Sequence, residues 1–264
     1  MEVRSLGYRT DLMLRRLAGA SVADRGDHLV VRTPANPTFY WGNFLLIDPP
    51  AAGTSPIWLE EFSREFPDAK HVAIGIDGVH GDTGDVSEMR AAGLELETNV
   101  VLTAERLRRP GRASSVDVRP LVSDTDWQQS VAVRLAVDED RGQEHREFVE
   151  RRAVEARRLM SDGHGEYFGA YVDGVVRASL GIVTDGQGLA RYQNVETHPH
   201  HRRQGLASAL LVAAAEAATS KFGATTFVIV ADPDYVAIDL YRALGFTDTQ
   251  RQVQLQRPTT PPEA

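Results

Sequence analysis

Residues 195–218 constrain the fold more than any other stretch, because they read as a strand end, a turn of small residues and an Ala-rich helix in direct succession. The turn holds Gly205, and Leu206 and Ala207 follow it. The first N–H groups of a helix have no intrahelical acceptor and lie at the positive end of its dipole. We therefore expect this junction to bind an anionic group such as a phosphate.

Two motifs together point to a family. Arg202, Gly205 and Ala207 form the pattern Arg-x-x-Gly-x-Ala behind a strand that ends near Thr197, and residues 234–246 end in Tyr-Arg-Ala-Leu-Gly-Phe. In this order, with a long helix and an apolar strand between them, they resemble the acyl-CoA signature and the closing motif of the GNAT N-acetyltransferase superfamily. The resemblance implies an α/β (α+β) fold, with a GNAT-type mixed, mostly antiparallel sheet flanked by helices.

The resemblance also implies the cofactor, acetyl-CoA, and the residues that bind it. Its pyrophosphate is expected on the helix N-terminus and its pantetheine arm along an open strand edge. The cofactor-binding residues are then Val195, Thr197, Arg202, Arg203, Gln204, Gly205, Leu206, Ala207, Ser208 and Asp234. Asp234 stands where the family usually has Asn, which adds a negative charge near the pantetheine arm while still allowing a helix cap.

Acyl transfer to an amine needs a base and a proton donor. A lysine-like amine has a pKa of roughly 10.4, so at neutral pH a base must take its proton. Glu196 is the candidate base, and the alternative is an ordinary exposed carboxylate on the strand. Tyr241 matches the family position that donates to the departing thiolate of coenzyme A, and the alternative is a ring packed under the sheet.

The first functional hypothesis is an acetyl-CoA-dependent N-acetyltransferase that transfers acetyl directly to a primary amine of a small molecule or peptide. The chain has no cysteine, which excludes an acyl-Cys relay. The alternative is a non-catalytic acyl-CoA-binding regulatory protein. An aminoacyl- or fatty-acyl-transferring relative is a third reading, disfavoured because a tRNA-borne donor calls for a more basic surface.

The composition limits the partners and the location. The net charge of −8 disfavours nucleic acid, and the absence of eighteen consecutive apolar residues disfavours a membrane span, so we expect a cytoplasmic monomer or homodimer. His198, His200 and His201 resemble metal ligands. A proline between the first two and the adjacent Arg202 and Arg203 favour phosphate instead, so no metal is expected.

The breaker-rich stretch 110–115 reads as a linker. We expect a first domain over 1–110, a catalytic domain over 116–257 and a disordered tail over 258–264. In the catalytic domain the patterns predict strands at 116–121, 166–172, 175–184, 188–197, 225–232 and 246–256, and helices at 124–136, 143–160, 204–221 and 235–243.

The first half of the chain shows sequence patterns in the same order as the second half, but it lacks the phosphate motif. An apolar strand ends at Asp77 as another ends at Asp232, and residues 89–95 parallel residues 241–247. Residues 47–49 stand where a Thr-His-Pro precedes the cradle in the second half. We infer a tandem duplication with a degenerate GNAT-like N-terminal half, which could contribute to an acceptor pocket. The alternative is that any two α/β halves show such echoes.

Overall fold

A computed structural model describes residues 1–109, 116–138 and 142–257 of the chain. These residues form two compact units. The N-terminal unit comprises Met1–Val101, Val230–Tyr235 and the stretch from Asp248 on, and the C-terminal unit comprises Leu102–Ile229 and Val236–Thr247. No helix in the described part of the chain is long and apolar enough to cross a membrane.

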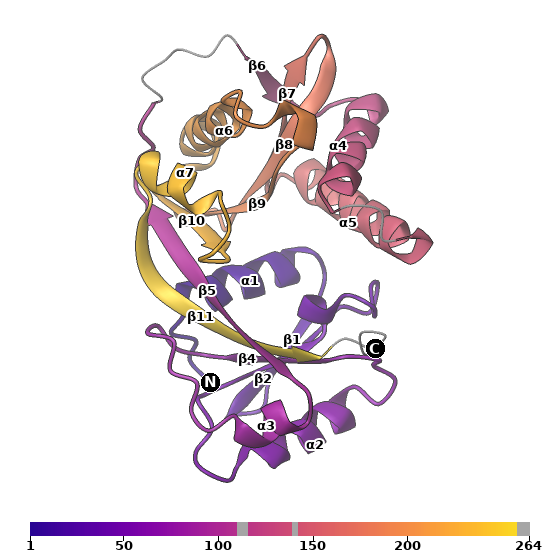
Figure 1. Ribbon diagram of the computed structural model, residues 1–264, viewed down its shortest axis with the longest axis vertical. Coiled ribbons are helices and arrows are strands. Elements are labelled where there is room, and N and C mark those ends of the chain that lie inside the picture. Colours follow the sequence, from indigo (N-terminus) through magenta and orange to yellow (C-terminus); the bar gives the residue numbers. More distant parts are fainter. Residues whose placement is uncertain (110–115, 139–141, 258–264) are drawn as a thin grey trace. The chain divides into compact units, whose positions relative to one another are not determined.

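The N-terminal unit is a strand layer with helices on both faces (Figure 1). Its strands follow the order β1-β2-β3-β4-β11-β5. The pairs β1–β2, β2–β3 and β4–β11 are antiparallel, and the pair β3–β4 is parallel. Its elements are α1 (Leu6–Leu17), β1 (Ser21–Asp24), β2 (His28–Arg32), the 3-10 turn η1 (Tyr40–Gly42), β3 (Phe44–Ile47), α2 (Ser55–Glu65), β4 (Val72–Ile76), α3 (Ser87–Ala91), β5 (Glu95–Ala104) and β11 (Thr247–Arg257).

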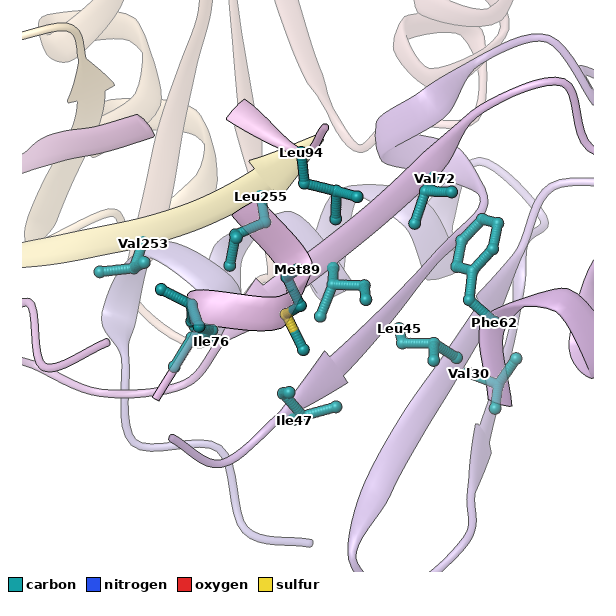
Figure 2. Close-up of a cluster of buried hydrophobic side chains, with 12 residues drawn as sticks. Val30, Leu45, Ile47, Phe62, Val72, Ile76, Met89, Leu94, Val253 and Leu255 are labelled. Carbon is teal, nitrogen blue, oxygen red and sulfur yellow. The ribbon is translucent and has the colours of Figure 1, made fainter. Parts of the chain in front are cut away.

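Alternation along these strands divides the core in two, because successive side chains of a strand point to opposite faces. Val30 and Leu45 face α2 and α3, where Phe62 and Met89 complete a fully buried cluster (Figure 2). The intervening residues, Val31 among them, face α1 instead and pack with its Tyr8 and Leu12. Both faces of the layer are therefore apolar, and each is covered by helix.

The C-terminal unit repeats this plan with the strand order β10-β9-β8-β7-β6. β9 and β10 pair in parallel, and the other neighbours are antiparallel. Helices α4 and α5 lie on one side of the strands and α6 on the other (Figure 1). The elements are β6 (Asp117–Pro120), α4 (Asp124–Val137), α5 (Gln143–Ser161), β7 (Gly165–Val172), β8 (Val175–Thr184), β9 (Leu189–Thr197), the 3-10 turn η2 (Pro199–His201), α6 (Leu206–Phe222), β10 (Thr226–Ala231) and α7 (Ile238–Ala243).

Local signals fix the ends of these helices. α4 begins in a capping box, in which the Ser123 hydroxyl accepts from the N–H of Asp126 and the Asp126 carboxylate accepts from the N–H of Ser123. α6 ends at Gly223, whose φ of 67° lies in the left-handed region. The Tyr192 hydroxyl on β9 donates to the main-chain oxygen of Leu211 at 2.7 Å, which ties α6 to the strand that precedes it.

The fold class expected from the sequence is confirmed: both units are mixed sheets, mostly antiparallel, flanked by helices. Helix α7 begins at Ile238 rather than at residue 235, so the prediction began this helix three residues too early. The last strand, β11, pairs antiparallel with β4 of the N-terminal unit through Val253 and Leu255. The units therefore do not divide the chain at a single point. The expected linker at 110–115 and tail at 258–264 lie outside the described residues.

Candidate functional site

The junction between β9 and α6 has the geometry of an anion cradle. After Thr197 the chain makes the turn η2, and then passes through Arg203 and Gly205, whose φ values of 61° and 80° are both left-handed. These two residues turn the backbone so that α6 starts at Leu206 with its first N–H groups at the turn. Arg202 and Arg203 are exposed beside it and supply positive charge.

Gly205, Leu206, Ala207 and Ser208 have main-chain N–H groups with no acceptor among the described residues. The first bond of α6 runs from the N–H of Ala209 to the oxygen of Gly205 at 3.0 Å. A Cβ built on Gly205 would meet no atom within 4 Å, so the space beside Gly205 is open. The arrangement suits a phosphate group, which bonds several N–H donors at a helix N-terminus.

Strand β9 presents a free edge next to this cradle. Its parallel ladder with β10 contains three pairs and ends at Arg191 and Val228, so residues 192–197 have no partner in that ladder. On the other side, the β8 pairing jumps across Asn194 and Val195. Asn194 has a left-handed φ of 49°, as expected for an extra residue in a bulge. Main-chain groups around Val195 and Thr197 can therefore bond an extended amide-bearing ligand.

Glu196, predicted from the sequence as a base, is buried on β9 with 6% of its side chain exposed. Its carboxylate accepts from the guanidinium of Arg134 on α4. Burial raises the pKa of Glu196 to about 7, and the Arg134 charge only partly offsets this rise. A carboxyl group with a pKa near neutrality can take and release protons at physiological pH. The alternative of an exposed strand carboxylate is wrong.

A chain of polar groups extends from Glu196. Arg134 donates from Nε to the Asp138 carboxylate at 2.6 Å, and His145 on α5 meets the same carboxylate oxygen through Nε2 at 3.1 Å. Tyr167 on β7 is buried nearby; burial and the Glu196 charge raise its pKa, while a hydrogen bond with Asn194 lowers it. Sequence reasoning missed Arg134, Asp138, His145 and Tyr167. No spacing rule could have found Arg134, which lies 62 residues from Glu196.

The other two predicted site residues lie around α7. Tyr241 is on α7 in the C-terminal unit, 4% exposed, with its ring 6.2 Å from that of Phe246. Asp234 belongs to the N-terminal unit and does not cap the helix, because the cap position is taken by Ala237. The expectation of a cap at Asp234 is therefore wrong, since the helix starts four residues later.

The corresponding junction of the N-terminal unit, between β3 and α2, is arranged differently. The parallel ladder of β3 with β4 runs to Ile47, and the N–H of Asp77 donates to the Ile47 oxygen at 2.7 Å. The Asp85 carboxylate accepts from the N–H of Gly53 at 3.0 Å, just before α2. The Ser87 hydroxyl and this Gly53 N–H lower the pKa of Asp85, which keeps a negative charge at the start of α2.

The described residues contain no group of three His, Cys, Asp or Glu side chains that could hold a metal ion. His198 illustrates the local chemistry. Burial and the neighbouring His200 and Arg177 lower the pKa of its ring, so it stays neutral, and its ring nitrogen accepts from the N–H of His200 at 3.3 Å. The three histidines belong to the turn behind β9, in which His198 precedes η2 and His200 and His201 lie within it.

Comparisons with known proteins agree with this geometry. Residues 132–246 match the model of the acetyltransferase (GNAT) family, and this segment contains the β9 edge, the cradle and α7. The chain therefore carries a domain of the GNAT acetyltransferase family, and the resemblance stated from the sequence is confirmed. Members of this family transfer acetyl groups from acyl-CoA. No curated protein matches the sequence.

Solved structures share the fold over nearly the whole chain. A conserved protein of unknown function from Staphylococcus epidermidis has a TM-score of 0.73 at 14% identity, covering 92% of this chain and 96% of its own. A GCN5-related N-acetyltransferase from Kribbella flavida has a TM-score of 0.61 at 17% identity, and the match covers 96% of both chains. A tandem GNAT protein from the clavulanic acid biosynthesis pathway has a TM-score of 0.54 at 15% identity, and the match covers 95% of this chain and 89% of that protein. These identities establish likeness of fold alone.

Proposed function

We propose that this protein is an acetyl-CoA-dependent N-acetyltransferase that acts on a primary amine of a small molecule or peptide. In this reaction a bond forms between the amine nitrogen and the acetyl carbon, and the carbon–sulfur bond of the thioester breaks. The amine gives up a proton and the departing thiolate takes one. The observation that carries the proposal is the set of four unpaired N–H donors at Gly205–Ser208, beside the open edge of β9.

The cradle would hold the cofactor. The N–H groups of residues 205–208 would bond the pyrophosphate, Arg202 and Arg203 would add attraction from solvent, and Gln204 would line the turn. Main-chain groups of Val195 and Thr197 would bond the pantetheine amides along the edge of β9. When bound, acetyl-CoA supplies an activated thioester carbonyl.

Glu196 would take the proton from the amine. Its buried position raises its pKa to about 7, so a large fraction is ionised at neutral pH and the group remains a stronger base than an ordinary carboxylate. Tyr241 would donate a hydrogen bond to the thiolate, the role of its position in the family pattern. The role of Glu196 as base predicts activity that rises with pH through about 7, because the carboxyl group accepts a proton only when it is deprotonated.

We also propose that the N-terminal half is a degenerate GNAT-like domain with no cofactor site. Two observations support this: the β3–β4 ladder stays closed at Ile47, and the Asp85 carboxylate accepts the Gly53 N–H where a phosphate would bind. A bound phosphate would meet the charge of Asp85 and repel it. Each chain would then bind a single acetyl-CoA.

Two glycines make a matched test of the cradle. Gly205 precedes α6 with φ 80°, and Gly53 precedes α2 with φ 73°, and neither would place a Cβ within 4 Å of another atom. Alanine therefore introduces similar backbone strain at both positions. Only at Gly205 would the methyl group stand before a phosphate.

The assay is isothermal titration calorimetry with coenzyme A, together with thiol release from acetyl-CoA across a panel of amines. Wild type is expected to bind one coenzyme A per chain. Gly205→Ala should weaken binding by roughly tenfold or more, about 1.4 kcal/mol, while Gly53→Ala should leave it unchanged. Absence of binding in wild type, or equal weakening by both variants, would refute the cradle.

The second candidate function is a non-catalytic acyl-CoA-binding regulatory protein. The ion pair between Glu196 and Arg134 favours it, because the base is engaged before any amine arrives. The same calorimetry and thiol-release panel separate the two. Tight coenzyme A binding with no thiol release for any amine would support the regulator, whereas amine-dependent release that is lost in Glu196→Gln would support the enzyme.

A further inference from the structure

Arg134 is shared between two carboxylates. Its Nη1 donates to Glu196 on β9, and its Nε donates to Asp138, one helical turn further along the chain, at 2.6 Å. The guanidinium side chain is 35% exposed, while the carboxylate side chains of Glu196 and Asp138 are 6% and 14% exposed. Because the donors are different nitrogens of one rigid plane, the bond to Asp138 fixes the orientation in which Arg134 meets Glu196.

The surroundings of Glu196 include groups from four elements. Arg134 and Asp138 come from the α4 region, His145 and Arg152 from α5, and Tyr167 from β7. Asn194 lies two residues before Glu196 on β9 and bonds the Tyr167 hydroxyl. Arg152 is paired with Glu155 on its own helix. Among the described residues, Arg134 is the cation that bonds the Glu196 carboxylate, and Asp138 is the anion that shares it.

We propose that Arg134 is a positioning residue for the acetyl-transfer reaction: it keeps Glu196 ionised and oriented, while Asp138 limits this effect by drawing on the same guanidinium. The inference rests on the proposed role of Glu196 as base. A fully buried carboxyl without a counter-charge stays protonated near neutral pH and cannot accept a proton. A carboxylate whose arginine partner bonds no other group has a low pKa and is therefore a weak base. Because Arg134 also bonds Asp138, the basicity of Glu196 lies between these two limits.

Coulombic effects on Glu196 have the signs that this arrangement requires. Arg134 lowers the pKa of Glu196 and Asp138 raises it, both against the larger upward effect of burial. Charges of opposite sign act in opposite directions whatever the role of the ion pair. A purely structural ion pair that fastens α4 to the strands would lose stability on mutation without moving the pH profile of kcat, so this profile distinguishes the two roles.

The test compares Arg134→Met with Asp138→Asn in the full-length protein. In the pH profile of kcat, the acid limb of wild type is expected near pH 7. Arg134→Met should move this limb upward by about one pH unit or more, because the ionised carboxylate loses its partner. Asp138→Asn should move it downward, because Arg134 then serves Glu196 alone. Any other pattern of shifts would overturn the proposal.

A second readout does not depend on activity. Carbon-13 NMR of protein labelled at the glutamate carboxyl, with Glu196→Gln to assign the signal, follows the ionisation of Glu196 directly. The same opposite displacements are expected in its titration. If wild type proved inactive towards amines while these displacements appeared, the proposed function would fail and the electrostatic role of Arg134 would stand. Unmoved titrations would refute that role even in an active enzyme.

Two further variants guard the interpretation. Arg134→Lys keeps the charge but cannot bond two carboxylates in one plane, so it should restore only part of the wild-type limb. Arg157→Met removes an ion pair with Asp124, 2.6 Å long, between α5 and α4 on exposed side chains. This control should leave both the pH profile and the Glu196 titration unchanged. If the pH profile or the Glu196 titration shifted in Arg157→Met, the shifts in the Arg134 variants would be attributed to weaker packing between α4 and α5.

Discussion

Replacing Glu196 by Gln is expected to flatten the pH dependence of stability in this protein. Burial raises the pKa of Glu196 from 4.5 to about 7 in the folded state. In the unfolded chain the group keeps an ordinary pKa, so the folded state binds its proton more tightly between these values. The stability contributed by this preference is fully present below the unfolded pKa and is lost as pH rises through about 7.

The magnitude follows from the shift. One pKa unit corresponds to 1.36 kcal/mol, so the whole effect amounts to about 3 kcal/mol. About 2 kcal/mol of this falls between pH 5.5 and pH 8.5, because part of the proton release in the unfolded chain is already complete at the lower pH. Glutamine cannot ionise and removes this dependence. The arginine that it leaves behind shifts stability by a similar amount at both pH values, since Arg134 stays charged throughout.

The measurement is urea-induced unfolding of wild type and Glu196→Gln at both pH values. Between pH 5.5 and pH 8.5, the free energy of unfolding of wild type should fall by about 2 kcal/mol more than that of the variant. Other titrating groups are common to both proteins and cancel in this difference. If the two proteins lost the same stability across the range, the buried carboxyl would not be shifted, and the base role built on that shift would lose its physical ground.

Two further predictions concern Tyr241 and the capping box of α4. Tyr241→Phe should lower kcat for acetyl transfer by roughly tenfold or more while leaving coenzyme A affinity unchanged, and calorimetry with steady-state kinetics checks this; equal kcat would remove the hydroxyl from the mechanism. Asp126→Asn should cost about 2 kcal/mol of unfolding free energy, because the carboxylate accepts from the N–H groups of Val122 and Ser123 and from the Tyr171 hydroxyl at 2.7 Å. Burial opposes ionisation of Asp126, but these hydrogen bonds from Ser123 and Tyr171 lower its pKa, so the loss should shrink as pH falls below about 4. A loss unchanged at low pH would contradict this account.

The cradle was accessible from the sequence because it is local. Arg202, Gly205 and Ala207 lie within six consecutive residues, and the donors they expose belong to a helix that starts at the same point. Hydrogen-bonding geometry over such a short stretch depends on backbone conformation alone, which glycine and helix propensity largely set. The same holds for the strands and helices of the C-terminal half, whose predicted bounds lie close to the observed ones except at α7.

Other features depended on tertiary structure. The sequence pattern could not say which strand the segment after Phe246 pairs with, since Val253 and Leu255 suit any buried layer, and β11 in fact pairs with β4. The burial of Glu196 was also hidden, because its strand mixes polar and apolar residues on both faces. Backbone pairing between distant strands depends on register and packing, which a local pattern leaves undetermined.

Sequence alone thus predicted the fold class, the family to which the domain belongs and the helix start at which the anion cradle is proposed. Tertiary structure alone decided that Arg134 meets Glu196 across 62 residues, that Asp138 shares it, and that Asp85 lies at the start of α2. The physical reason is the range of the forces involved. A helix terminus and its donors are set by neighbours along the chain, whereas the charge state of a buried carboxyl depends on every group that folding brings within a few ångströms of it.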